Sequence, residues 1–316
     1  MVYGPCGGVR DGGGCEMQEM PCVFPQPVVP PGQTESRALR SVPMVLSDFS
    51  TPPFDRAAVA RTSAILAQSC DAVLVGEHQN RPDYPPTLFA EMLLESGVRP
   101  WVTLACRDRN RVVLEQELRG LQHVGVDAVL CVTGDGRAHG VRPEITQVFD
   151  LDGPRLAMLA AQIGISAAVA ETPVAEPRAL RPHRLVAKQR CGAAVAVLNH
   201  VARTGDVAAF MSVAQAAGLS IPVIAAVAIY TDEQSATVLA GLPGLELDAD
   251  TVRDVLGAPD PHAAGIDAAV AQAQALLAID GVLGVNLSGL GSAHGWEHGA
   301  QLKAEVGARI KAGRRG

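Results

Sequence analysis

The chain has 316 residues, of which 48% are hydrophobic and 19% charged, so it encodes a folded globular protein. Its net charge of −7 leaves no basic stripe for a phosphate backbone, which excludes nucleic acid as an expected partner. The sequence holds no apolar run of the roughly eighteen residues that a transmembrane helix needs, so we expect no membrane partner.

The N-terminal part is predicted to be separate from the main domain. Residues 1–24 are rich in Gly and Cys and show no helical or strand period, and residues 25–42 form a Pro-rich linker. No positively charged segment followed by an apolar stretch marks a signal peptide. Seven cysteines without an export signal favour reduced thiols or metal ligands over disulfides. We therefore expect a cytoplasmic protein.

From residue 43 onward, short and nearly continuous apolar runs alternate with longer amphipathic stretches, as in parallel strands that are buried on both faces. The eight runs are 44–49, 72–76, 100–106, 128–135, 165–170, 193–199, 221–228 and 281–290. Eight strands with helices between them predict an α/β protein, a (β/α)8 TIM barrel over residues 43–300, followed by a C-terminal helix or tail at 301–316.

Two helices between these runs carry start signals. One is predicted after Asn110, a candidate N-cap, and the other begins at Thr231 with Gln234 at capping-box spacing. The interval 229–280 is long enough for more than one helix. The rival architecture is an open doubly wound sheet, but no G-x-G-x-x-G follows the first run and no P-loop is present. The barrel is favoured.

In such barrels the active site lies at the C-terminal ends of the strands. The residues that follow the predicted strands are polar or titratable: Asp48, Glu77, His78, Arg107, Asp108, Arg109, Thr133, Asp135, Asn199, His200, Tyr230 and Ser288. Because these ends meet at one rim, the sequence predicts an enzyme with a polar mouth.

Each of these signals also has a purely structural interpretation. The segment Arg107–Arg109 can be a rim salt-bridge cluster, and Asp135 can be a turn residue after a glycine. His78 and His200 are single loop histidines. Cys106 and Cys131 lie in or beside strands, where a small core residue is expected.

The stretch 103–140, TLACRDRNRVVLEQELRGLQHVGVDAVLCVTGDGRAHG, resembles the third strand, the following helix and the fourth strand of methylenetetrahydrofolate reductases. CRDRNR and TGD are its distinctive parts. Further similarity lies at PPFD (52–55), DYPP (83–86), VFDLD (148–152), LVAKQRCGA (185–193) and 229–256, so the resemblance covers roughly residues 43–292.

The resemblance implies an oxidoreductase of one-carbon metabolism, on the route to methionine. Such a flavoprotein would use FAD and NAD(P)H to reduce the folate substrate 5,10-methylenetetrahydrofolate to 5-methyltetrahydrofolate. It also implies a catalytic role for Asp135, for which Asp48 and Glu77 are candidate catalytic partners, and contacts to substrate from Asp135, Asn199 and Tyr230. The implied cofactor-binding residues are Thr103, Cys106, Asp108, Thr133, Asp135, Asp152 and Lys188. Lys188 is one of only three lysines, and a lone cation suits a diphosphate.

The chain departs from the family pattern at three positions of the mouth. The family's first strand ends in a glutamate that acts as the general acid. Asp48 is the nearest carboxylate here, but Phe49 takes that position if the following prolines keep their register. Gly76, with Glu77 beside it, replaces a threonine, and Asn199 replaces a glutamine. Asp48 or Glu77 can restore an acid if burial raises its pKa.

The segment MVYGPCGGVRDGGGCEMQEMPC resembles a cysteine-rich domain found at the C-terminus of some of these reductases or on their partner subunits. Cys6, Cys15 and Cys22 would supply three thiolates to a Zn²⁺ ion, which needs a fourth ligand. An iron–sulfur cluster and free thiols are the alternatives. Such a module would also suit docking to a partner enzyme or to another copy of the chain.

Three functions follow. The first is the flavin-dependent reductase. The second is a flavin-free folate-binding barrel that transfers hydride directly from a nicotinamide or handles a one-carbon unit without redox chemistry. The third is a non-catalytic partner subunit.

Overall fold

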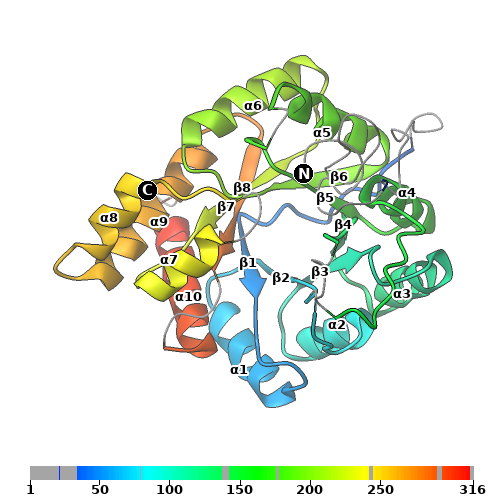
Figure 1. Cartoon of the computed structure of the whole chain (residues 1–316), viewed down its shortest axis with the longest axis horizontal. Coiled ribbons are helices and arrows are strands. Elements are labelled where there is room, and N and C mark those ends of the chain that lie inside the picture. The colour runs from blue at the N-terminus through cyan, green and yellow to red at the C-terminus, as the bar shows by residue number, and fades with distance from the viewer. Residues whose placement is uncertain are drawn as a thin grey trace.

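The structure, a computed structural model, describes residues 21, 34–78, 80–136, 142–175, 178–241, 245–289 and 294–313. Eight parallel strands close into a barrel in the order β1-β2-β3-β4-β5-β6-β7-β8, with helices around them (Figure 1). The (β/α)8 prediction is therefore confirmed, and all eight predicted runs contain a strand. The strands are β1 Val45–Phe49, β2 Ala72–Val75, β3 Pro100–Ala105, β4 Ala128–Val132, β5 Ala167–Glu171, β6 Ala193–Leu198, β7 Val223–Ala228 and β8 Val282–Ser288.

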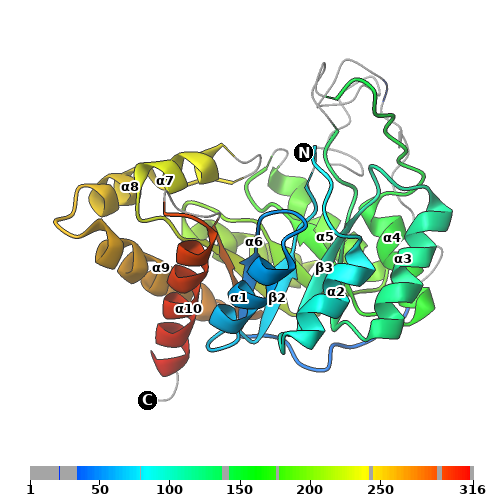
Figure 2. The same ribbon diagram turned by 90° about the horizontal axis from the view of Figure 1, so that it is seen from below.

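The helices cover the outside of the barrel, and three of them connect β7 to β8, as the length of 229–280 predicts (Figures 1 and 2). They are α1 Arg56–Leu66, α2 Pro86–Glu95, α3 Arg111–Val124, α4 Gly153–Ile163, α5 Arg181–Arg190, α6 Thr204–Ala216, α7 Glu233–Ala240, α8 Ala249–Leu256, α9 Pro261–Leu277 and α10 Trp296–Gly313, with a 3-10 turn at Arg178–Leu180.

The predicted first residue is correct for α3 and wrong for α7. Asn110 caps α3 as predicted, because its side-chain oxygen accepts a hydrogen bond from the Val113 amide at 3.0 Å. The predicted start at Thr231 is wrong by one residue: Asp232 is the N-cap of α7 and forms a capping box with Ser235. An aspartate accepts from the helix amides more strongly than a threonine hydroxyl, which explains the shift.

Two apolar layers hold the barrel together. The inner layer consists of alternate strand residues that meet on the barrel axis: Leu46, Ala72, Leu74, Trp101, Ala128, Leu130, Ala168, Val195, Val197 and Ile224. The intervening residues, such as Val102, Val129 and Val169, face the helices in a larger cluster. Successive side chains of a strand point to opposite faces. A strand residue in the inner layer therefore shows that its neighbours on either side face the helices, and the residue two positions away faces the barrel axis again.

The segment 34–43, which falls largely within the predicted linker, lies against the barrel. Leu39 and Val42 pack on the inner layer. The Arg37 guanidinium donates to the Gly164 carbonyl at 2.6 Å. A Cβ at Gly284 would clash with the Pro43 carbonyl oxygen, so this glycine lets the segment approach β8. At the other end, α10 crosses the predicted boundary at residue 300 and packs on α1 and α9.

Candidate functional site

The direction of Asp48 follows from the strand to which it belongs. Leu46 lies in the inner layer, so Asp48, two residues later, also faces the barrel axis. Phe49 points the other way and packs edge-on against Phe89 of α2, with ring centroids 5.9 Å apart. The sequence left open whether Asp48 or Phe49 ends the first strand at the mouth. The structure places Asp48 there.

The Asp48 side chain is held by two donors from β8. Asn286 Nδ2 donates to Asp48 Oδ1 and Ser288 Oγ donates to Oδ2, each at 2.8 Å. The Lys303 ammonium of α10 donates to the Asp48 carbonyl at 2.7 Å. Asn286 is only 4% exposed, and its Oδ1 atom is buried without a hydrogen-bond partner among the described residues. The mouth thus presents a fixed carboxylate, and the Asn286 amide that holds it has a buried oxygen atom.

Asn286 is a site residue that sequence reasoning missed. The available signal was a single amide within the apolar run of the last strand, GVLGVNLSGL. A polar side chain in a strand that is buried on both faces needs a partner, and here that partner is Asp48.

A cavity of ≈ 430 Å³ opens at the ends of β2 and β3. It brings together three predicted site residues, Glu77, Thr103 and Asp108, with Tyr84 and Phe89 as aromatic walls. The Arg109 guanidinium lies 2.7 Å from Glu77 Oε1 and also borders this cavity. Arg109 therefore forms a salt bridge at the rim, and it also lines a cavity in which a ligand can contact it.

Glu77 has an unusual electrostatic environment. Burial raises the pKa of its carboxyl group above the ordinary value, and the neighbouring Arg109 guanidinium offsets only part of this effect. The ion pair is correspondingly shielded, with the Glu77 side chain 16% exposed and that of Arg109 21% exposed. A carboxyl group with a raised pKa can donate a proton at a higher pH than an ordinary glutamate.

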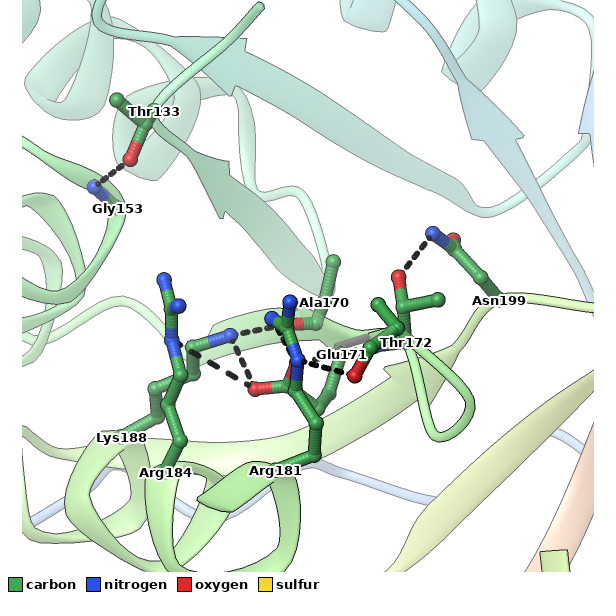
Figure 3. Close-up of polar contacts among 10 residues, drawn as sticks. Thr133, Gly153, Ala170, Glu171, Thr172, Arg181, Arg184, Lys188 and Asn199 are labelled. Atoms are coloured by element: carbon green, nitrogen blue, oxygen red, sulfur yellow. Dashed lines mark hydrogen bonds and ion pairs between the residues drawn. The ribbon is translucent and has the colours of Figure 1, made fainter. Parts of the chain in front are cut away.

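Thr133 and Asp152 together build the start of α4. Thr133 Oγ1 accepts a hydrogen bond from the Gly153 amide at 2.8 Å (Figure 3). Asp152 caps the helix through the Arg155 amide at 2.7 Å and forms an ion pair with the Arg155 guanidinium at 2.6 Å. Asp152 is fully buried, so in this structure it stabilises the helix and does not present a carboxylate to a ligand.

Lys188 lies in a group of cations around Glu171, which ends β5. Its ammonium is 2.8 Å from Glu171 Oε2 and donates to the Ala170 carbonyl at 2.5 Å. Arg181 contacts the other carboxylate oxygen at 3.2 Å, and Arg184 approaches Oε2 at 3.9 Å (Figure 3). Lys188 is thus not the isolated cation that the sequence suggested.

The remaining predicted residues lie apart from one another. Asn199 donates to Thr172 Oγ1 at 2.8 Å at the end of β6 (Figure 3). Tyr230 lines a second cavity of ≈ 490 Å³ together with His200 and Asp248. The Asp135 carbonyl accepts from Arg107 at 3.2 Å. His200 is buried and lies 3.1 Å from the Gln272 amide, as expected of a structural histidine.

Cys106 does not fit the predicted cofactor contact. It is fully buried in the helix-facing layer with Cys131, so its thiol faces away from the mouth. Burial also raises the pKa of both thiols, which keeps them protonated and unreactive. The interpretation of Cys106 and Cys131 as core residues is confirmed.

The predicted metal ligands Cys6, Cys15 and Cys22 lie outside the described residues. Within the described part of the chain, no group of three His, Cys, Asp or Glu side chains is placed to hold a metal ion. No helix in that same part is long and apolar enough to cross a membrane.

Together, fold and site define a (β/α)8 barrel with a polar mouth. No protein-family model matches the chain, and no curated protein matches it. A similar solved structure is an uncharacterised protein from Clostridium thermocellum that binds two copies of 5-methyl-5,6,7,8-tetrahydrofolic acid. It has a TM-score of 0.61 and 10% sequence identity, over 90% of this chain and 97% of that one.

Two weaker similarities are to biosynthetic enzymes. The dihydropteroate synthase from Thermus thermophilus has a TM-score of 0.47 and 19% identity, over 87% of this chain and 94% of that chain. A tryptophan synthase from M. tuberculosis has a TM-score of 0.46 and 14% identity, over 87% and 93%. At 10% identity the similarity to the Clostridium thermocellum protein shows the fold alone, and none of these similarities assigns a family.

Proposed function

We propose that this chain binds a reduced folate in the barrel mouth and that Asp48 and Asn286 hold its pterin ring. A pterin presents a 2-amino group and an adjacent ring N–H, which both donate hydrogen bonds. The Asp48 carboxylate faces the barrel axis and keeps acceptor capacity beyond its bonds to Asn286 and Ser288. The unsatisfied Asn286 Oδ1 is the observation that carries the proposal, because a buried acceptor without a partner is costly unless a ligand satisfies it.

Two further observations support a folate ligand. The structurally similar protein from Clostridium thermocellum binds 5-methyltetrahydrofolate, and its barrel aligns with 90% of this chain. The resemblance of residues 103–140 to methylenetetrahydrofolate reductases points to the same substrate class. Neither observation identifies the reaction, which has to be argued from the residues at the mouth.

For the reaction, we propose direct reduction of 5,10-methylenetetrahydrofolate by a nicotinamide. Protonation of N10 breaks its bond to the bridging methylene carbon and leaves an iminium at N5. Hydride from C4 of NADH or NADPH then reduces that carbon, giving 5-methyltetrahydrofolate and NAD(P)⁺. Glu77 is the proposed proton donor, because burial raises the pKa of its carboxyl group and it borders the cavity beside the mouth.

The flavin-dependent reaction is the second candidate. Its support is the sequence resemblance around Asp135, Asp152 and Lys188. The geometry fits it less well, because Asp152 is fully buried as a helix cap and Lys188 is paired with Glu171. Asp152 would have to give up its capping bonds to contact the ribose of a flavin. A flavin, when bound, would relay electrons from the nicotinamide to the folate.

One set of measurements on the purified chain separates these functions. Calorimetry with 5-methyltetrahydrofolate tests the binding site, and the visible spectrum after incubation with FAD and desalting tests for a flavin. NADH oxidation at 340 nm with 5,10-methylenetetrahydrofolate, without added flavin, tests direct transfer. Folate binding with flavin-independent turnover supports the proposal. Turnover only with bound FAD favours the second candidate, and binding without turnover favours a partner role. No folate binding overturns both enzymatic functions.

A further inference from the structure

The cavity of ≈ 490 Å³ that Tyr230 lines is separate from the barrel axis. It is bordered by the end of β7 and by residues of α6, α8 and α9, and Figure 1 shows α8 and α9 together at the side of the barrel where β7 and β8 lie. Ala228 and Tyr230 at its edge belong to the apolar cluster that packs on α7 and α8, not to the inner layer. We call it the β7 cavity. Small-molecule sites have volumes of about 300–1,000 Å³, so it is large enough for a ligand of its own.

Only β8 separates the β7 cavity from the Asp48 carboxylate. Ala228, which lines the cavity, pairs in register with Ser288 of β8, and the Ser288 hydroxyl donates to Asp48 Oδ2 at 2.8 Å. A long ligand can therefore place one end in the cavity and the other end at the mouth.

Arg203 and the start of α6 give the β7 cavity a positive end. Arg203 is exposed, and among the described residues it acts on Asp248 electrostatically without forming an ion pair with it. Thr204 and Gly205 of the first turn of α6 also line the cavity, and no described side chain caps this helix. A Cβ at Gly205 would meet no atom within 4 Å, so the turn is open to a ligand. Asp206 in the same turn offsets part of the helix dipole, which leaves the guanidinium as the main attraction for an anion.

Asp248 places a carboxylate in the same cavity. The amides of Asp250 and Thr251 both donate to its Oδ1 atom, at 2.9 and 3.0 Å. These bonds, chiefly that of the Thr251 amide, hold the pKa of Asp248 below its ordinary value, so the carboxylate stays ionised. A carboxylate has about four acceptor positions, so its second oxygen keeps capacity for hydroxyl donors of a ligand.

The rest of the wall is apolar and built from small side chains: Ala202, Ala228, Ala268, Ala269, Ala271 and Ala275. The Tyr230 ring and the buried His200 complete it. His200 Nε2 lies 3.1 Å from Gln272 Nε2, which donates, so Nδ1 carries the imidazole proton. Nδ1 is buried without a hydrogen bond to the described residues, although the Glu246 backbone is near enough to raise the pKa of the ring. Such a wall suits a flat heterocycle with a polar edge.

We propose that the β7 cavity holds the ADP half of NADH, the hydride donor of the reaction. The inference rests on the proposed function. An ADP group has a diphosphate, a ribose with two hydroxyls and a flat base, and the cavity offers the Arg203 guanidinium, the Asp248 carboxylate and the alanine wall. The nicotinamide half has to meet the folate in the mouth, so the ADP half is the part that a cavity beside the barrel axis receives. A carboxylate accepts from ribose hydroxyls and repels a 2′-phosphate, so the site favours NADH over NADPH.

The test is calorimetry on the full chain with ADP-ribose and with its 2′-phosphate as probes. We expect the wild type to bind ADP-ribose about tenfold more tightly than the 2′-phosphate, because the Asp248 carboxylate repels the additional charge. Arg203→Gln should weaken ADP-ribose binding by about tenfold, since the diphosphate loses a charge-assisted donor. Asp248→Asn keeps an N-cap residue at the start of α8 and should bring the ratio of the two affinities close to one.

Two matched controls remove the same charges outside the cavity and should leave both affinities at their wild-type values. Arg190→Gln lies on α5, and Asp250→Asn lies on α8, where the Asp250 side chain is 78% exposed in an ion pair with Arg253. Ala271→Trp tests the cavity without changing any charge, because Ala271 lines it from an exposed position of α9. The indole should block the cavity and weaken ADP-ribose binding by about tenfold. Thermal unfolding establishes that each variant is folded, and Ala271→Trp decides the question should a charge variant unfold.

The outcomes separate this inference from the proposed function. A wild type that binds 5-methyltetrahydrofolate but not ADP-ribose overturns the inference and leaves the folate site intact. ADP-ribose binding that none of the three cavity variants weakens also overturns it, because the nucleotide then binds elsewhere. Binding of ADP-ribose that depends on Arg203, in a chain that binds no folate, supports the nucleotide site and overturns the proposed function.

Steady-state rates with NADH distinguish this dinucleotide from another adenine nucleotide. Arg203→Gln should raise the KM for NADH by about tenfold and leave kcat unchanged, because the ADP half contributes binding and takes no part in hydride transfer. A KM at the wild-type value, together with weakened ADP-ribose binding, would assign the cavity to another adenine nucleotide and overturn the inference.

Discussion

Asn286 donates its amide N–H to Asp48 at 2.8 Å, while its own side-chain oxygen is buried and has no partner in the part of the chain that the structure describes. The bond fixes the orientation of the Asn286 amide against the Asp48 carboxylate, which faces the barrel mouth. Since each carboxylate oxygen of Asp48 already receives one donor, the pair is held before any ligand arrives. Such pre-organisation reduces the entropy lost on binding.

Replacing Asp48 by Asn should weaken the binding of 5-methyltetrahydrofolate by about tenfold to a hundredfold, because a buried donor of the ligand then loses its charged acceptor. Calorimetry measures the change. The control is Asp267→Asn, which removes one charge from an exposed ion pair with Arg309 and should have no effect. Unchanged affinity in Asp48→Asn would show that the pterin binds elsewhere.

Glu77→Gln separates catalysis from binding. If Glu77 protonates N10, the substitution should lower turnover by about 10²–10⁴-fold and leave the folate dissociation constant within about twofold of wild type. Because the pKa of Glu77 is raised, the wild-type carboxyl group should stay protonated to higher pH than an ordinary glutamate, and turnover should fall as pH rises through that pKa. Steady-state rates across pH measure both effects.

Glu115→Gln, on the exposed face of α3, is the control for this experiment. It removes a carboxylate that pairs only with Arg119 among the described residues and should leave the pH profile unchanged. A Glu77→Gln variant with wild-type turnover would exclude Glu77 as the acid and return that role to Asp48.

The barrel could be predicted from the sequence because eight apolar runs with intervening helical patterns leave few arrangements open. The same periodicity explains why Asp48 faces the mouth, once Leu46 is known to lie inside the barrel. Contacts between distant residues could not be predicted in this way. The apolar run of the fifth strand ends at residue 170, so the pattern gives no reason to include Glu171, the partner of Lys188, in the site. Asn286 is hidden in the same way, because it lies within an apolar run.

The predicted linker shows the same limitation. Its Pro-rich composition indicates a linker, but composition does not show where Leu39 and Val42 pack. We expect Leu39→Ala and Val42→Ala each to lower the free energy of unfolding by about 1 kcal/mol, because both side chains contact the inner layer of the barrel and are partly buried. Urea denaturation measures the loss. Val112→Ala, at a position that is 73% exposed, is the control and should change it by less than about 0.5 kcal/mol.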